Sequence, residues 1–281
     1  MRWLMASSMM ATIVLAAAFA SSAGAAPPPG YVVVHSASIS ASVDSQSHGV
    51  VACPAGTVPL GGGANVRSTS FQADMADSYP VGTEGWAADV NNGTGAAFTF
   101  TVWVVCGTQP TGYTIVETPL QVDLPPNGTT LLSQACPLGT RVLGGGGSTD
   151  TVSTSLAIAS TYPSKKLIGT HTQYSWNVVF DNTSATDAFG TTWAICGSPA
   201  GYRLVQHAAV NLGGRGVTQT TVHPTCPSPT VPLSGGVKAT EDTGITLNRT
   251  FPSGTTWRSV ENDNAPLLNA TITPYVVCAG T

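Results

Sequence analysis

Short runs of β-branched and aromatic residues, separated by clusters of glycine, proline and asparagine, follow one another along most of the chain. Such runs are typical of β-strands bounded by turns, and no stretch after residue 25 sustains a helical period with caps. The pattern therefore predicts an all-β protein.

The order of these runs occurs three times. Each copy opens with Gly-Tyr, at Tyr31, Tyr113 and Tyr202, and continues through a Cys-Pro, a glycine cluster and a tryptophan to a closing cysteine. We divide the chain into repeats 26–109, 110–199 and 200–281. The tethers between them have three or four residues, so neighbouring repeats should pack together. The fold class expected is three tandem antiparallel β-sandwich or Greek-key-like repeats, which could be related by a pseudo-threefold axis, with one disulfide each.

Six strands are expected in each repeat. The first begins at the Gly-Tyr, the second leads into the Cys-Pro and the third into the glycine cluster. The fourth ends near an aromatic-Pro pair, the fifth begins at the tryptophan and the sixth ends at the closing cysteine. The aromatic-Pro pairs are Tyr79-Pro80, Tyr162-Pro163 and Phe251-Pro252, and the tryptophans, which we assign to the core, are Trp86, Trp176 and Trp257.

The first 25 residues have the pattern of a secretory signal peptide, with Arg2, an apolar run over 9–20 and Ala23-Gly24-Ala25 as the cleavage site. The apolar run is too short for a membrane span, and no later stretch approaches the roughly 20 apolar residues that a span needs. We therefore expect a secreted, extracellular protein with no membrane span.

An exported chain can keep disulfides, because they persist in oxidising compartments. Two pairings respect the repetition of the six cysteines. One closes each repeat, as Cys53–Cys106, Cys136–Cys196 and Cys226–Cys278; the other joins the repeats in a ring, as Cys106–Cys136, Cys196–Cys226 and Cys278–Cys53. We favour the first, since similar units could each fold and oxidise alone.

Charge is sparse, with 10 basic and 14 acidic side chains, and only Lys165 and Lys166 are adjacent basic residues. A nucleic-acid-binding surface needs a basic patch, so this composition argues against nucleic acid as a partner. Low charge with abundant Thr, Ser, Asn and Gly suits an extracellular β protein with an uncharged polar surface.

The glycine clusters Gly61-Gly62-Gly63 and Gly144-Gly145-Gly146 follow Cys-Pro-x-Gly, and the third repeat has Ser234-Gly235-Gly236. A phosphate cradle would need a following helix, so we interpret these glycines as sites of close approach by another strand, which could line the axis. The motif resembles a group of secreted actinobacterial proteins with no assigned activity, over essentially the whole chain after the signal. A looser likeness exists to vitelline membrane outer layer and jacalin-type proteins, which build a β-prism from three sheets. Neither resemblance assigns a functional residue here.

No catalytic motif stands out. The chain has no G-x-S-x-G and no H-E-x-x-H, the cysteines are assigned to disulfides, and the histidines share no repeat position. A hydrolase using His171 or His223 with a nearby aspartate stays open as an alternative. Segment 181–187 offers oxygens of the kind calcium prefers, but it lacks the EF-hand glycine and glutamate, and Asn and Asp also stabilise tight turns. We expect no metal and no cofactor.

The last strand of each repeat carries the best binding candidates. Disulfide sulfurs are normally buried, so the face opposite the closing cysteine should point outward, and aromatic rings among threonines suit stacking on sugars. The candidates are Trp103, Trp193, Tyr275, Thr101, Thr191 and Thr273. The alternative is that these aromatics pack between repeats.

Three functions remain open at this point. The first is a non-enzymatic module that binds glycan or another cell-surface polymer through three similar sites, which would gain avidity on a repeating ligand. The second is an extracellular structural or assembly protein without a small ligand. The third is an unrecognised secreted hydrolase.

Overall fold

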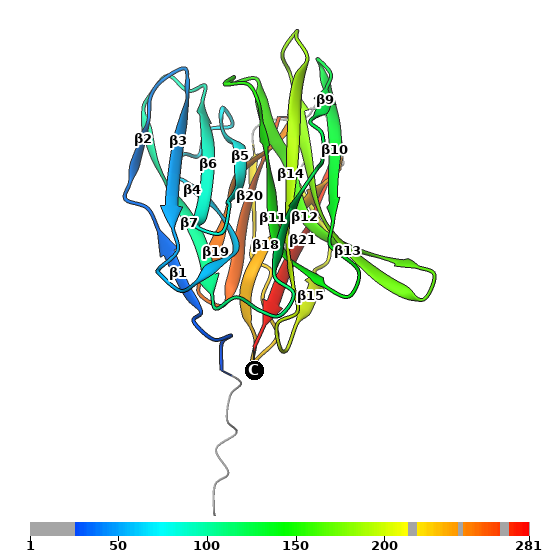
Figure 1. The fold of residues 1–281 in the computed structure, drawn as a ribbon. Helices are drawn as coiled ribbons and strands as arrows, with labels where there is room; N and C mark the ends of the chain where they lie inside the picture. The colour runs from blue at the N-terminus through cyan, green and yellow to red at the C-terminus, as the bar shows by residue number, and fades with distance from the viewer. Residues whose placement is uncertain (1–25, 213–217, 241–243, 265–269, 281) are drawn as a thin grey trace, which may run out of the picture.

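A computed structural model describes residues 26–212, 218–240, 244–264 and 270–280, and the expected signal peptide lies outside these ranges (Figure 1). All of the regular structure in this part of the chain is β-strand, as predicted.

The strands of the first repeat are β1 (Val32–His35), β2 (Ile39–Ala41), β3 (Ser45–Ala52), β4 (Val58–Val66), β5 (Ala73–Val81), β6 (Gly85–Asn92) and β7 (Phe98–Gly107). Those of the second are β8 (Thr114–Glu117), β9 (Val122–Leu124), β10 (Gly128–Ala135), β11 (Arg141–Thr149), β12 (Leu156–Ile168), β13 (His171–Asn182) and β14 (Ala188–Gly197). Those of the third are β15 (Arg203–Gln206), β16 (Val210–Asn211), β17 (Thr218–Val222), β18 (Val231–Ala239), β19 (Ile245–Ser253), β20 (Thr256–Asp263) and β21 (Thr271–Ala279). The six expected strands are present in every repeat, and the short strands β2, β9 and β16 were not anticipated.

These strands form three antiparallel sheets of seven strands each. Sheet A has the order β1-β7-β4-β19-β20-β17 with β2 beside β7, sheet B has β3-β6-β5-β11-β14-β8 with β9 beside β14, and sheet C has β10-β13-β12-β18-β21-β15 with β16 beside β21. Each sheet therefore takes strands from two repeats, joined at the pairs β4–β19, β5–β11 and β12–β18. The three sheets contact one another around one shared hydrophobic core (Figure 1).

The disulfides follow the within-repeat scheme: Cys53–Cys106, Cys136–Cys196 and Cys226–Cys278. The first cysteine of each pair follows a strand of one sheet, and the second lies in a strand of another. The bridges thus join sheet B to A, C to B and A to C. The favoured pairing is confirmed, but each bridge connects two sheets instead of closing a self-contained unit.

The first position of each glycine cluster lies where the three repeats meet. A Cβ on Gly61 would come within 2.5 Å of the Leu233 carbonyl oxygen, and one on Gly144 would overlap the Leu60 carbonyl oxygen. In the third repeat, the Ser234 hydroxyl instead donates a hydrogen bond to the Leu143 carbonyl oxygen. The contacts run cyclically through the three repeats, so the clusters surround a pseudo-threefold axis.

The second glycine of each cluster makes room for the core tryptophan. A Cβ on Gly235 would lie 2.6 Å from the ring of Trp257, and those on Gly62 and Gly145 would overlap Trp86 and Trp176. The three indoles are at most 2% exposed, as predicted. Their Nε1 atoms donate to the hydroxyls of Ser78, Thr161 and Thr250 at 2.9, 2.9 and 2.7 Å.

Candidate functional site

The outer faces of the three sheets carry the aromatic residues that were predicted there from the alternation of side chains along the last strand of each repeat. The closing cysteines of β7, β14 and β21 are fully buried, whereas Trp103, Trp193 and Tyr275 on the same strands are half-buried. Each of the three lies on a different sheet. The structure therefore does not bring them together; it presents three separate outer faces.

Each outer aromatic packs against a ring from another repeat, stacked in two pairs and tilted by 38° for Trp103 and Phe251. The ring centroids are 5.6 Å apart for Trp103 and Phe251, 5.3 Å for Trp193 and Tyr79, and 5.6 Å for Tyr275 and Tyr162. The residue opposite each outer aromatic on the neighbouring strand is the last glycine of a cluster: Gly63, Gly146 or Gly236. The aromatic pairs therefore span the seams between repeats while part of each outer ring stays accessible.

The threonine candidates differ in accessibility. Thr191 and Thr273 are half-buried, but Thr101 is only 5% exposed, which corrects the expectation that it belongs to an accessible binding surface. Its hydroxyl oxygen accepts a hydrogen bond from Nε1 of Trp103 at 2.9 Å, and the ring of His35 lies 4.5 Å from that indole. The face of sheet A is thus largely occupied by its own side chains.

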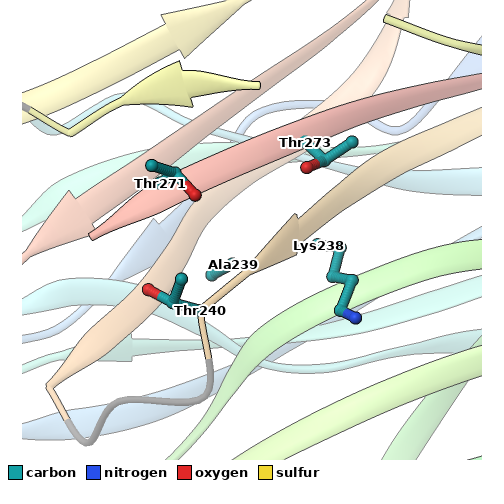
Figure 2. A pocket seen from close by; sticks show the side chains of 5 residues that line it. All are labelled: Lys238, Ala239, Thr240, Thr271 and Thr273. Atoms are coloured by element: carbon teal, nitrogen blue, oxygen red, sulfur yellow. The ribbon is translucent and has the colours of Figure 1, made fainter. Parts of the chain in front are cut away.

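The face of sheet C is hollowed beside its aromatic pair. One hollow of about 360 Å³ is lined by Lys238, Thr271 and Thr273, with Ala239 and Thr240 at its end; Figure 2 shows the two threonines along β21 and Lys238 on the neighbouring β18. A second hollow of about 310 Å³ has Tyr275 in its wall. Its other lining residues are Pro163, Ser164, Lys165, Leu204 and Gln206.

Tyr275 and Thr273 stand two residues apart on β21, so the aromatic pair lies between the two hollows. The Lys238 ammonium is 5.7 Å from the centroid of Tyr162, which places a cation over the second ring of the pair. Burial raises the pKa of Tyr275, so its phenol is neutral and can donate or accept a hydrogen bond at neutral pH. The surface combines an aromatic ring, hydroxyls and two ammonium groups, those of Lys238 and Lys165.

Sheet B has an ionisable row that the sequence analysis missed. Nδ1 of His48 lies 2.8 Å from Oδ1 of Asp89, and Asp77 pairs with Asp89 on the next strand. Burial and the neighbouring Asp89 raise the pKa of Asp77 well above its usual range. Comparison of the repeats could have revealed this row, since the corresponding positions are Leu131, Val179 and Ser160 in sheet C and Thr221, Val260 and Arg249 in sheet A.

The asparagine turns that could have held calcium are closed by their own side chains. Oδ1 of Asn182 accepts hydrogen bonds from the backbone N–H and the hydroxyl of Ser184, and Oδ1 of Asn92 accepts the same two bonds from Thr94. The turn interpretation of these residues is confirmed. Asp181 is the exception, because its side chain lies at a cavity on the axis.

No protein-family model matches the chain, and no curated protein does either. Within the described ranges, no helix is long and apolar enough to cross a membrane. The three disulfides indicate an oxidising compartment.

Proposed function

We propose that this protein is a secreted, non-enzymatic binding protein for glycan or another polymer of a cell surface, and that the outer face of sheet C is its main contact. One observation carries the proposal: the Tyr275–Tyr162 pair lies beside two hollows lined mainly by hydroxyl, amide and aliphatic groups. Volumes of about 310 and 360 Å³ are at the lower end of those of small-ligand pockets.

The chemistry of this face suits polyhydroxylated ligands. A sugar ring presents C–H groups on one face and hydroxyls at its edge, so an aromatic ring can cover the first while threonine hydroxyls bond the second. Two hollows on either side of one ring would take successive residues of a chain. The aromatic pairs on sheets A and B offer weaker contacts, which would add avidity on a repeating polymer.

An extracellular assembly role is the second candidate, and the hairpin β12–β13 favours it. These strands have 13 and 12 residues, longer than their counterparts in the other repeats, and the hairpin projects from the body of the molecule (Figure 1). Its tip exposes Leu167 and Ile168 by 70% and 48%. Exposed apolar side chains of this kind are common at contacts between proteins.

Replacing Tyr275 by alanine tests the glycan proposal. The variant should weaken retention on an insoluble polysaccharide by about tenfold, because loss of an aromatic contact costs on the order of 1.4 kcal/mol. The measurement is the fraction of protein depleted from solution at increasing polysaccharide concentration. Leu120→Ala is the matched control, since Leu120 is 80% exposed and lies between β8 and β9 of sheet B, and it should bind like the wild type. Equal depletion of all three proteins would exclude Tyr275 from the site.

A further inference from the structure

A cavity of about 380 Å³ lies on the pseudo-threefold axis, at the end where β6, β13 and β20 finish. All three repeats contribute to it, and we call it the axial cavity. Its acidic lining residues are Asp74 and Asp181, and hydroxyl groups come from Thr154, Ser155, Thr183 and Thr246.

The fifth residue after the core tryptophan occupies the same place in every repeat, and it is Asn91, Asp181 or Asn262. The two amides connect neighbouring repeats. Nδ2 of Asn91 donates to the Leu156 carbonyl oxygen at 2.7 Å, and Nδ2 of Asn262 donates to the Ala73 carbonyl oxygen at 3.0 Å. An ionised carboxylate cannot donate such a bond, so Asp181 breaks the pattern.

The carboxylate of Asp181 is buried and incompletely bonded. Asp181 is 1% exposed, and Oδ2 accepts a hydrogen bond from the Gly244 N–H at 3.0 Å. Oδ1 is buried without a hydrogen-bond partner among the described residues. An orphaned carboxylate oxygen in such a position is costly unless something binds it.

The space beside Asp181 comes from the residue paired with it across the hairpin. Asn91 pairs with Asp74 and Asn262 with Thr246, but Asp181 pairs with Ala157. The alanine methyl is smaller than either counterpart. The cavity is therefore hollow next to the carboxylate whose Oδ1 atom has no hydrogen-bond partner among the described residues.

Asp74 is the second acid of the cavity. It is 8% exposed, and Oδ1 accepts a hydrogen bond from Asn91 at 2.8 Å. Burial is the main reason that the pKa of Asp74 is raised to about 7; hydrogen bonds to Asn91 and Thr246 oppose the shift, and the charge of Asp181 adds to it, so the two carboxyl groups repel each other when both are ionised. A bound cation would relieve this repulsion.

We propose that the axial cavity binds a calcium ion through the carboxylates of Asp181 and Asp74, with neutral oxygens of the cavity lining completing the coordination. The lining offers oxygen ligands, which calcium accepts in irregular sets of six to eight, whereas magnesium requires a near-octahedral arrangement. Among the described residues that line the cavity, only Asp74 and Asp181 carry a charge, so the site has low charge. An affinity in the range of about 0.1 to 1 mM, typical of extracellular calcium modules, follows.

The site is independent of the outer faces, and so is its test. Thermal unfolding of the full chain should shift upward by about 4 °C or more as CaCl₂ is raised to about 10 mM, with a smaller shift for MgCl₂. Calorimetric titration of calcium should give one site. Asp181→Asn introduces the amide that the other two repeats carry, so it should stay folded and lose the calcium shift.

Two further variants make the result decisive. Asp187→Asn removes an exposed carboxylate from the adjacent turn and should keep the shift. Ala157→Val keeps both carboxylates but fills the hollow beside Asp181, so it should abolish the shift even if Asp181→Asn does not fold. An unchanged melt of the wild type in calcium, or an equal shift in wild type and Ala157→Val, would overturn the proposal. Loss of the shift in Asp187→Asn would move the ion to the turn and overturn it as well.

Discussion

Gly146→Ala should lower the melting temperature by about 10 °C or prevent folding altogether. A Cβ at this position would overlap the carbonyl oxygen of Ser78 in the neighbouring strand β5. The oxygen is part of the backbone and the Cβ is bonded directly to it, so neither atom can move without its strand. The strands would have to separate at the seam between two repeats, at a cost of about 3 kcal/mol or more. For a chain of this size, each kcal/mol corresponds to about 2–4 °C.

Gly95→Ala is the matched control for this substitution. A Cβ on Gly95 would meet no atom within 4 Å, and its φ is not in the left-handed region. The change should therefore shift the melting temperature by no more than about 1–2 °C, as is usual for surface substitutions. Circular dichroism melts of both variants give the comparison. A Gly146→Ala protein that melts like the control would show that the strands are not held this closely.

Reduction of the three disulfides should unfold the protein near physiological temperature. Each bridge joins two different sheets, so reduction removes all three disulfide cross-links between sheets and leaves only the backbone connections. Loss of a native disulfide from a small secreted domain costs about 2–5 kcal/mol, and three such losses approach or exceed the total stability of most domains, about 5–15 kcal/mol.

The measurement is a thermal melt after reduction, with a thiol assay that confirms six free cysteines in the unfolded sample. Cys226→Ser/Cys278→Ser removes the bridge between sheets A and C alone and should give an intermediate melting temperature. If the fully reduced chain melts at the temperature of the oxidised one, the shared core is sufficient and the bridges contribute nothing measurable.

The strands and disulfides were predictable because the same sequence pattern occurs three times along the chain. Repetition identified the strand that contains Cys106, for instance, and reduced the pairings to two schemes, of which the favoured one, with Cys53–Cys106, is present. The distribution of strands among sheets was not predictable in this way. Nothing in the local pattern around Thr250 indicates that β19 pairs with β4 of the first repeat, because hydrogen bonds between distant strands leave no periodic signal.

The sequence predicted which side chains point to the outer faces of the sheets, but not how far each of them is exposed. Alternation along β7 placed Trp103 and Thr101 on the same face, but it does not predict which side chains on that face cover one another: Thr101 is 5% exposed, and its hydroxyl is bonded to the indole of Trp103. Asp181 shows the opposite case. Its sequence neighbours indicated a turn, and only the packing of three repeats around one axis places its carboxylate in a cavity with Asp74.

The central claim is that the outer aromatics bind a surface polymer, and depletion by insoluble polysaccharide tests it most directly. Wild type and Trp103→Ala/Trp193→Ala/Tyr275→Ala are mixed with cellulose, chitin and peptidoglycan, and the protein left in solution is measured. Circular dichroism first establishes that the variant keeps its β signal. We predict that at least one polymer removes the wild type while the folded variant stays in solution. Wild type that remains in solution with every polymer, or a variant that is removed equally well, would contradict the claim.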